Sequence, residues 1–288
     1  MLFSASGTMK ADHGGLVSVV IPTYNRAKLL LEALESVFHQ TYDRFEVIVV
    51  DDGSTDGTSS VVSGPNLVYL SVVHTGLPGL LRNIGIRRSQ GAYIAFLDSD
   101  DLWEPTKLAR QVALLKEYPE TLVCHSAESW IRNEHAVSQA SQKHRRKGYL
   151  YEDSLRKCII SPSTVMLDRR VFSQIGLFRE DIEIAEDYEL WLRVTAKYLV
   201  GYIDEPLATK RGGHSDQLSQ KYGQIEIFRI HALTALIEGS GLNDEQQIGA
   251  RSELARKCRI YAAGCLKRGR HEEAARYAAL ARTQQAYA

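Results

Sequence analysis

The residues with the clearest chemical potential are three aspartates within four positions, Asp98, Asp100 and Asp101. They follow an apolar run, residues 93–97, whose aromatic and β-branched side chains are typical of a buried strand in a parallel sheet. Ligands of open α/β sheets bind beyond the carboxyl ends of the strands, which is where these acids would lie. Clustered carboxylates suit a divalent ion that also carries substrate phosphates. The alternative is a polar turn in which Asp101 caps the next helix.

Acidic pairs recur at two other places where predicted elements meet loops. Asp51 and Asp52 follow a second apolar run, residues 45–50, and Glu186 and Asp187 open an amphipathic helical pattern. One such pair can be explained as helix capping, and that alternative stays open for the second pair. Three clusters at one edge of a sheet instead indicate a site for a nucleotide diphosphate and a metal ion.

The elements that must position these acids alternate between strands and amphipathic helices. This alternation predicts a parallel sheet with right-handed crossovers. The first strand is expected to stop at Pro22, because proline cannot donate to a sheet ladder. Predicted strands cover residues 16–21, 45–50, 67–73, 93–97, 122–125, 128–132, 163–167, 198–203 and 207–210, with the last two as edge strands.

Two other segments differ in character. Residues 133–148 are polar and end in a basic run, which predicts either a surface loop or a basic lid over an anionic ligand. From residue 216 onward the pattern is helical, with stretches at 225–239, 244–267 and 271–284. We therefore expect a disordered N-terminus (1–15), one α/β domain (16–215) and a C-terminal helical region (216–288).

The composition is that of an ordinary globular protein, with 44% hydrophobic and 24% charged residues among 288. Because the formal net charge is zero, no global field favours a nucleic-acid partner. The four cysteines form no CxxC pair, and the small, polar first fifteen residues lack the apolar core of a signal peptide. No apolar run approaches the roughly 18 residues that cross a bilayer. These features predict a cytoplasmic protein.

Five short motifs, in order, resemble those of glycosyltransferase family 2, the inverting enzymes with the GT-A fold. The resemblance covers about residues 16–215 and implies a Rossmann-like, mostly parallel central sheet with helices on both faces, followed by the helical appendage. The motifs are VIPTYNR (20–26), VVDDGSTD (49–56), RNIGI (82–86), FLDSDDLW (96–103) and EDYELWLR (186–193).

The resemblance implies a role for the residues after the first two strands. Pro22, Thr23 and Tyr24 would bind the donor, with Thr23 and Tyr24 flanking the nucleobase and Tyr24 stacking on it. Asp52 would accept a hydrogen bond from an imide nitrogen of the base, which favours uracil or thymine over purines. The implied donor is therefore a nucleotide-diphosphate sugar, most simply a UDP-sugar.

The resemblance also assigns the central acidic cluster. Asp98 would hold the ribose or assist the metal, Ser99 would contact the donor, and Asp100 would ligate Mn²⁺ or Mg²⁺. Arg82 would contact the diphosphate or the acidic site, although a salt bridge on the helix surface is an alternative.

On the acceptor side, Asp187 would be the general base that deprotonates the acceptor hydroxyl. His214, in the cluster Arg211-Gly212-Gly213-His214, is the candidate third metal ligand, with an ordinary glycine turn as the alternative. The Gln-x-x-Arg-Trp signature of processive members is absent, which indicates a single-transfer enzyme.

The sequence leaves two alternative functions open. A sugar-nucleotide nucleotidyltransferase would normally carry a glycine-rich loop after the first strand, where this chain has Pro22 and Thr23. A non-catalytic nucleotide- or sugar-binding module would not need Asp187.

Expected partners are the sugar nucleotide and a carbohydrate or lipid-linked acceptor in polysaccharide or glycoconjugate synthesis. The basic tail predicts either peripheral contact with an anionic membrane or a solvated face and homo-oligomer contact. Its cations are Arg251, Arg256, Lys257, Arg259, Lys267, Arg268 and Arg270.

Overall fold

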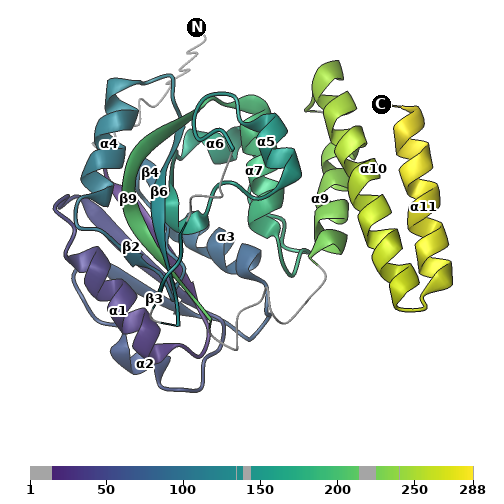
Figure 1. Ribbon diagram of the computed structural model, residues 1–288. Coiled ribbons are helices and arrows are strands. Elements are labelled where there is room, and N and C mark those ends of the chain that lie inside the picture. The colour runs from purple at the N-terminus through teal and green to yellow at the C-terminus, as the bar shows by residue number, and fades with distance from the viewer. Residues whose placement is uncertain (1–14, 134, 139–143, 214–224, 240, 288) are drawn as a thin grey trace, which may run out of the picture.

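A computed structural model describes residues 15–133, 135–138, 144–213, 225–239 and 241–287. Within these residues nine strands form one sheet in the order β3-β2-β1-β4-β8-β6-β9-β5, and β7 pairs with β6 (Figure 1). The strands are β1 Val17–Thr23, β2 Phe45–Asp51, β3 Leu67–Ser71, β4 Tyr93–Phe96, β5 Leu102–Trp103, β6 Val123–Arg132, β7 His135–Ala136, β8 Val165–Asp168 and β9 Val200–Gly212.

Helices cover both faces of this sheet, and a further helical layer packs beyond one of them (Figure 1). Helices α1, α2 and α4 lie on one side, and α3, α6 and α7 lie on the other. The helices are α1 Ala27–Phe38, α2 Thr58–Val61, α3 Pro78–Arg88, α4 Lys107–Glu117, α5 Tyr151–Arg156, α6 Arg170–Ile175, α7 Glu186–Lys197, α9 Glu226–Glu238, α10 Asp244–Lys267 and α11 His271–Ala286.

The first four strands confirm the predicted parallel arrangement, since β1 pairs in parallel with β2 and β4, and β2 with β3. Successive side chains point to opposite faces of a strand. Val19 and Ile21 therefore pack with α1 and α4, whereas Val20 packs with the α6 and α7 side. This double burial explains why these strands read as continuous apolar runs.

The second half of the sheet departs from the prediction. Strand β4 is parallel to β1 but antiparallel to β8, so it is not flanked by parallel strands on both sides. The predicted pair 122–125 and 128–132 is one strand, β6, with irregular pairing around Ser126 and Ala127. The two predicted edge strands are also one strand, β9, which lies inside the sheet between β6 and β5. Bulged pairing keeps these strands continuous where their alternation breaks.

Pro22 does not end the first strand, which continues to Thr23. Pro22 pairs with Val50 of β2, whereas the pairing of β1 with β4 ends at Val20. The β4 side of β1 is therefore unpaired in the sheet ladder at Pro22, so the missing N–H costs no ladder hydrogen bond.

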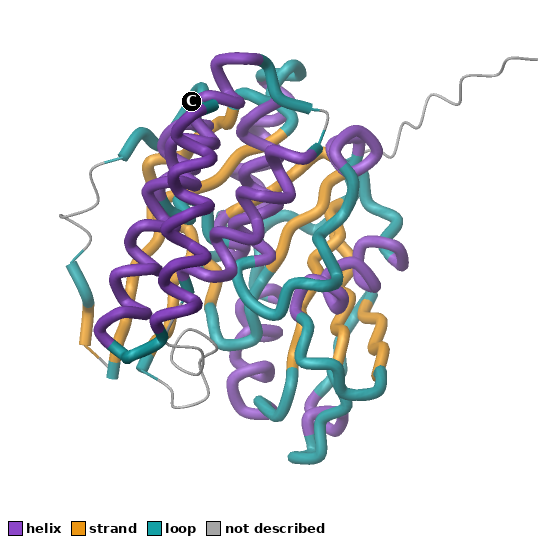
Figure 2. Tube along the Cα trace, turned by 90° about the vertical axis from the view of Figure 1, so that its right-hand side faces the viewer, coloured by secondary structure: helices purple, strands orange, loops and turns teal. Residues whose placement is uncertain are grey.

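The C-terminal helices fall where the sequence predicted them and share a hydrophobic core with α5 and α7. Tyr188 and Leu192 of α7 pack in one cluster with Leu233 of α9, Leu254 of α10 and Ala281 of α11. Figure 2 views this layer with the sheet behind it. The predicted disordered N-terminus, up to residue 14, and the predicted boundary at 215/216 lie outside the described residues. Among the described helices, none has the length and apolarity to cross a bilayer.

Candidate functional site

A cavity of about 630 Å³ opens at the carboxyl ends of β1, β2 and β4. Every predicted site residue except His214 lines it, and His214 lies outside the described residues. The predicted residues that the fold brings together here are Pro22, Thr23, Tyr24, Asp52, Arg82, Asp98, Ser99, Asp100 and Asp187. Helices α3 and α7 and the start of α9 complete the wall.

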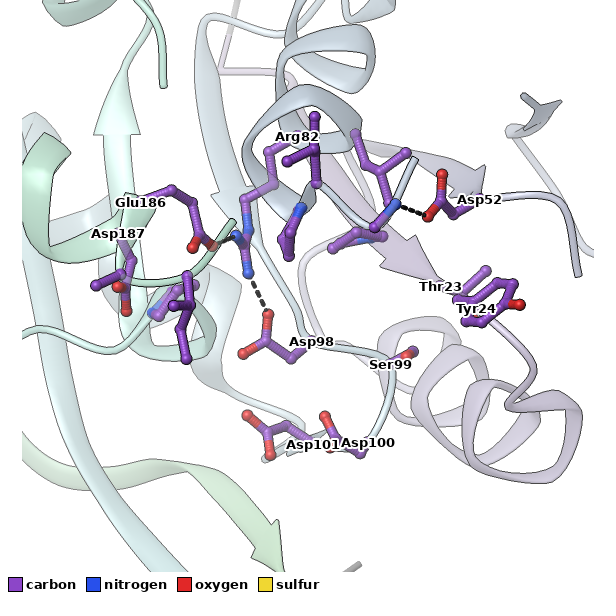
Figure 3. Close-up of a pocket in the computed structure, with 18 of the residues that line it drawn as sticks. Thr23, Tyr24, Asp52, Arg82, Asp98, Ser99, Asp100, Asp101, Glu186 and Asp187 are labelled. Carbon is purple, nitrogen blue, oxygen red and sulfur yellow. Dashed lines mark hydrogen bonds and ion pairs between the residues drawn. The ribbon is translucent and has the colours of Figure 1, made fainter. Parts of the chain in front are cut away.

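Arg82 lies at the centre of this cavity and joins two of its acids (Figure 3). Its Nη2 donates to Asp98 Oδ1 at 2.7 Å, and its Nη1 forms an ion pair with Glu186. The side chain is 5% exposed, so the alternative of a salt bridge on the helix surface is wrong. Helix α3 can come this close to the sheet because of Gly85, where a Cβ would meet Val20 at 2.3 Å.

The charge of Arg82 changes the behaviour of its neighbour. Burial opposes ionisation of Asp98, but the cations Arg82 and Lys210 hold its pKa below the ordinary value. Asp98 is therefore a carboxylate whose negative charge is compensated by the protein.

The other two acids of the cluster are less fully compensated. Asp100 Oδ2 lies 2.8 Å from Arg26 Nη1, and burial nevertheless raises the Asp100 pKa. Asp101 accepts hydrogen bonds from Ser163 Oγ at 2.6 Å and from the Arg211 N–H at 3.1 Å. Burial raises the pKa of Asp101 to about 7. An added cation near these carboxylates would favour their ionised forms.

Asp101 does not cap the following helix, which corrects the alternative derived from the sequence. Helix α4 begins at Lys107, six positions after Asp101, and its N-cap is Thr106. Asp101 instead ties the end of β9 to the turn after β4 through the Arg211 N–H.

The described residues contain no group of three or more histidine, cysteine, aspartate or glutamate side chains arranged to hold a metal ion. Magnesium is commonly held by one or two carboxylates together with substrate phosphates and water. The pairing of a buried Asp100 with a raised pKa and an adjacent cavity fits that mode of binding.

The Asp52 carboxylate accepts hydrogen bonds from a single turn of the chain. Its Oδ1 accepts from the N–H and the hydroxyl of Thr75, and its Oδ2 accepts from the Gly76 N–H. His74 Nδ1 also lies 2.8 Å from Asp52 Oδ2. A carboxylate offers about four lone-pair sites. A nucleobase that binds Asp52 must therefore replace one of these donors, and the two that come from side chains are the Thr75 hydroxyl and the half-exposed His74 imidazole.

The residues after β1 present a stacking surface and an unsatisfied hydroxyl. Tyr24 is 40% exposed and stacks on His74. Thr23 is buried, and its Oγ1 has no hydrogen-bond partner among the described residues. A buried hydroxyl without a partner at a cavity wall is a candidate ligand contact.

Asp187 stands at the opposite end of the site from Tyr24 and Asp52 (Figure 3). It lies in the first turn of α7, after Ala185 in the left-handed conformation (φ 67°). Its Oδ1 accepts from the Tyr188 N–H at 2.6 Å, and its Oδ2 lies 3.4 Å from Cys158 Sγ. One Asp187 oxygen thus accepts from the N–H of the next residue, Glu186 pairs with Arg82, and the N-cap of α7 is Ala185, without a side-chain cap.

Sequence reasoning gave no role to several residues that line the cavity, among them five with titratable side chains. His74 and Arg26 follow strand ends in the chain, which is the one signal that pointed toward them. Cys158 follows α5, Lys210 lies in β9 and Arg229 lies in α9. No local sequence pattern connects these residues with the acids.

Comparisons with known proteins identify the family of the chain. A family model described as glycosyl transferase family 2 matches residues 18–176, more than half of the chain. An uncharacterized glycosyltransferase of Rickettsia bellii is 35% identical over 68% of this chain and 28% of its own length. The chain spans about a third of the length of this and two further Rickettsia relatives.

Two other relatives are matched over more of their length. The putative teichuronic acid biosynthesis glycosyltransferase TuaG of Bacillus subtilis is 30% identical over 76% of this chain and 91% of its own. The Escherichia coli protein WfaP, named a UDP-Glc:α-D-GlcNAc-diphosphoundecaprenol β-1,3-glucosyltransferase, is 30% identical over 63% of this chain and 71% of its own.

Solved structures share the fold. S. aureus TarS (residues 1–349, with UDP-GlcNAc) superimposes with a TM-score of 0.69 at 24% identity, covering 86% of this chain and 73% of TarS. The mannosyltransferase PcManGT of Pyrobaculum calidifontis, solved with GDP-Man and Mn²⁺, gives a TM-score of 0.61 at 18% identity, covering 93% and 86%. These likenesses confirm the predicted α/β fold of GT-A type with C-terminal helices. The chain belongs to glycosyl transferase family 2.

Proposed function

We propose that this chain is a metal-dependent, inverting glycosyltransferase that moves one sugar from a UDP-sugar to a hydroxyl group of a glycoconjugate acceptor. One observation carries the proposal: Asp98 and Asp187 lie in one cavity on either side of the buried Arg82 (Figure 3). This arrangement would separate a donor-side acid, Asp98, from an acid that is available as a base, Asp187.

On the donor side, Tyr24 would stack on the nucleobase and Asp52 would accept its imide N–H once His74 moves away. The unpartnered Thr23 Oγ1 and the nearby Pro22 and Ser99 would contact the donor. Asp98 would hold the ribose. Support comes from the names of the E. coli relatives, which describe UDP-glucose as the donor.

Asp100 would hold Mn²⁺ or Mg²⁺ together with the donor diphosphate, with His214 as a further candidate ligand. When bound, such an ion would neutralise the negative charge that develops on the leaving diphosphate. Arg26, which pairs with Asp100 in this structure, would then be released toward the phosphates.

On the acceptor side, Asp187 Oδ2 would take the proton of the acceptor hydroxyl as its oxygen attacks the anomeric carbon. Attack from the face opposite the diphosphate breaks the sugar–phosphate bond and inverts the anomeric centre. Arg82 and Glu186 would position the start of α7, because their ion pair joins it to α3 beside Asp98.

The structure supports membrane contact by the basic tail less strongly than its composition does, because some of its cations are paired or buried. Arg256 pairs with Glu253, Arg270 pairs with Glu273, and Lys257 is buried. Peripheral membrane contact and homo-oligomer formation stay predictions. Co-sedimentation with anionic but not with neutral liposomes is the expected result for the first.

The first experiment is calorimetric titration of UDP, TDP and GDP into the protein, with and without Mn²⁺. We expect UDP to bind more tightly than GDP and only weakly without the metal. Absence of binding by every nucleotide in the presence of Mn²⁺ would contradict the proposed function. Binding of UDP without transfer to any acceptor would favour a nucleotide-binding module.

A further inference from the structure

Helix α9 belongs to the C-terminal helical layer, yet it reaches the cavity. Ile225, directly before α9, and Arg229 in its first turns both line the cavity wall. Arg229 lies against the ring of Tyr188, and Asp187, directly before Tyr188, contacts Cys158. The end of the cavity beyond Asp187 is therefore built by two layers of the fold.

Arg229 is held firmly at this end of the cavity. Its guanidinium carbon lies 5.8 Å from the centre of the Tyr188 ring, and Tyr188 is itself fixed by a 2.6 Å hydrogen bond from its hydroxyl to the Leu155 carbonyl. Arg229 Nη1 donates to Glu226 Oε1 at 2.8 Å, and Arg229 Nε is buried without a partner among the described residues. The guanidinium therefore keeps an unused donor while its position is fixed.

Arg229 shares its carboxylate partner with a second cation. Glu226 is shared, because Lys257 Nζ lies 3.2 Å from its second oxygen. Lys257 also lies 3.3 Å from Glu253, which in turn pairs with Arg256. Three cations thus share two carboxylates. Lys257 is 1% exposed, so water screens its charge poorly, and Arg229 is the member of this cluster that lines the cavity.

The charged groups that line the cavity besides Arg229 include Asp187 and Lys210. Lys210 Nζ lies 3.0 Å from Ser161 Oγ and 4.0 Å from Asp101 Oδ2, so its charge is partly compensated by the acidic cluster. Asp187 adds one negative charge at this end, but among the described residues it forms no ion pair with Arg229, whose direct carboxylate partner is Glu226.

We propose that Arg229 recognises a phosphate or diphosphate group of the acceptor, and that the C-terminal helices thereby select anionic acceptors. A guanidinium with a free N–H in a partly buried wall binds phosphate oxygens through charge-assisted hydrogen bonds. The donor diphosphate is expected at Asp98 and Asp100, so it does not account for a cation beyond Asp187. This inference rests on the proposed function, and it adds the acceptor's chemical class.

The test uses three probes and protein saturated with UDP and Mn²⁺. The first is N-acetylglucosamine joined through a diphosphate to an octyl chain, and the second is the neutral octyl glycoside of the same sugar. The third, octyl diphosphate, carries the anion without a sugar, so the choice of sugar does not decide the outcome. Calorimetry gives the Kd of each probe for the wild type, Arg229→Gln, Arg229→Lys and Arg259→Gln.

We expect the wild type to bind both diphosphates at least about 10-fold more tightly than the neutral glycoside, the size of one charge-assisted contact. Arg229→Gln should remove most of this preference, and Arg229→Lys should restore part of it. Arg259→Gln, which alters an exposed cation of α10, should keep it. UDP affinity should be equal in all four proteins.

Equal binding of anionic and neutral probes by the wild type, failure of all three to bind, or a preference that survives Arg229→Gln would overturn the inference. Each of these results can occur in a protein that binds UDP normally, and then only the inference fails. A wild-type protein that does not bind UDP contradicts the proposed function itself.

Discussion

The imidazole of His74 stacks on the phenol ring of Tyr24, with ring centroids 4.0 Å apart and planes inclined by 18°. The same imidazole places Nδ1 2.8 Å from Asp52 Oδ2. These are the two contacts proposed for the nucleobase, a stack on Tyr24 and a hydrogen bond to Asp52. His74 therefore occupies the position proposed for the base, and a nucleotide that binds there must displace it.

Replacing His74 should consequently strengthen nucleotide binding. The stack and the half-exposed contact with Asp52 are together expected to stabilise this position of His74 by about 1 kcal/mol, so His74→Ala should lower the Kd for UDP by about 5-fold. Tyr24→Ala, which removes the stacking surface from both partners, should raise the Kd. Calorimetry on both variants decides the matter, and weaker UDP binding by His74→Ala would show that the imidazole packs against the bound base instead.

Asp100→Asn should abolish the metal dependence of UDP binding. Asp100 is the carboxylate proposed to hold the ion, and an amide oxygen binds Mg²⁺ or Mn²⁺ more weakly than a carboxylate. We expect Mn²⁺ to improve UDP affinity at least about 10-fold in the wild type and less than about 2-fold in the variant, as judged from one or more ion contacts. Asp204→Asn, at an exposed aspartate of β9, is the control. An undiminished Mn²⁺ effect in Asp100→Asn would refute the assignment.

Asp187→Asn should uncouple binding from transfer. Loss of a positioned general base typically costs about 10²- to 10⁴-fold in rate, whereas the nucleotide contacts at the other end of the cavity remain. The measurements are kcat for sugar transfer and the Kd for UDP in the same preparation. Asp181→Asn, at a surface aspartate that pairs with Arg179, should behave like the wild type. Unchanged turnover in Asp187→Asn would remove this residue from the mechanism.

His125 should make the protein less stable in acid. It is buried in β6, its Nε2 donates to the Arg146 carbonyl at 2.6 Å, and burial with the neighbouring charges of Arg146 and His144 lowers its pKa to about 4. Between pH 6.5 and 4 an unfolded histidine binds a proton that the folded His125 does not bind. The free energy of unfolding should therefore fall as the pH falls through this range, by at most about 1.4 kcal/mol per pH unit.

Urea denaturation at several pH values measures this effect. His125→Gln keeps an N–H donor but cannot titrate, so its unfolding free energy should change less between pH 6.5 and 4 than that of the wild type. Parallel pH profiles for the two proteins would show that His125 does not contribute. His144, whose pKa burial also lowers to about 4, contributes to both profiles equally.

Lys257→Met should destabilise the contact between the C-terminal helices and the sheet domain. Lys257 donates to the Arg156 carbonyl and pairs with Glu226 and the buried Glu253, so its loss removes a shared cation from both carboxylates and a donor from the Arg156 carbonyl. Breaking a buried ion cluster in this way typically costs about 3–5 kcal/mol. Urea denaturation followed by circular dichroism measures the loss, and Lys267→Met, at an exposed position of the same helix, is the control. A loss no larger than that of Lys267→Met would contradict the expected role.

The sequence by itself determined the order of elements in the first half of the chain and the edge at which the acids gather. Strands buried on both faces consist of continuous apolar residues, and the carboxyl ends of parallel strands meet at one edge of the sheet. The helices of the C-terminal region could be predicted equally well, because α9, α10 and α11 follow local periodicity. The proposed roles of Asp98, Asp100 and Asp187 come from the family resemblance and await the experiments above.

The tertiary structure decided which residues meet across long stretches of chain. Arg82 and Glu186 are 104 positions apart, and only the packing of α3 against α7 makes them a buried pair. The same holds for His74 on Tyr24 and for Arg229 beside Tyr188. The strand pairings of β6 and β9 also escaped prediction, because bulges interrupt the alternation on which a sequence pattern depends. Local periodicity reports burial, whereas the partner of a buried charge is fixed only by how the elements pack.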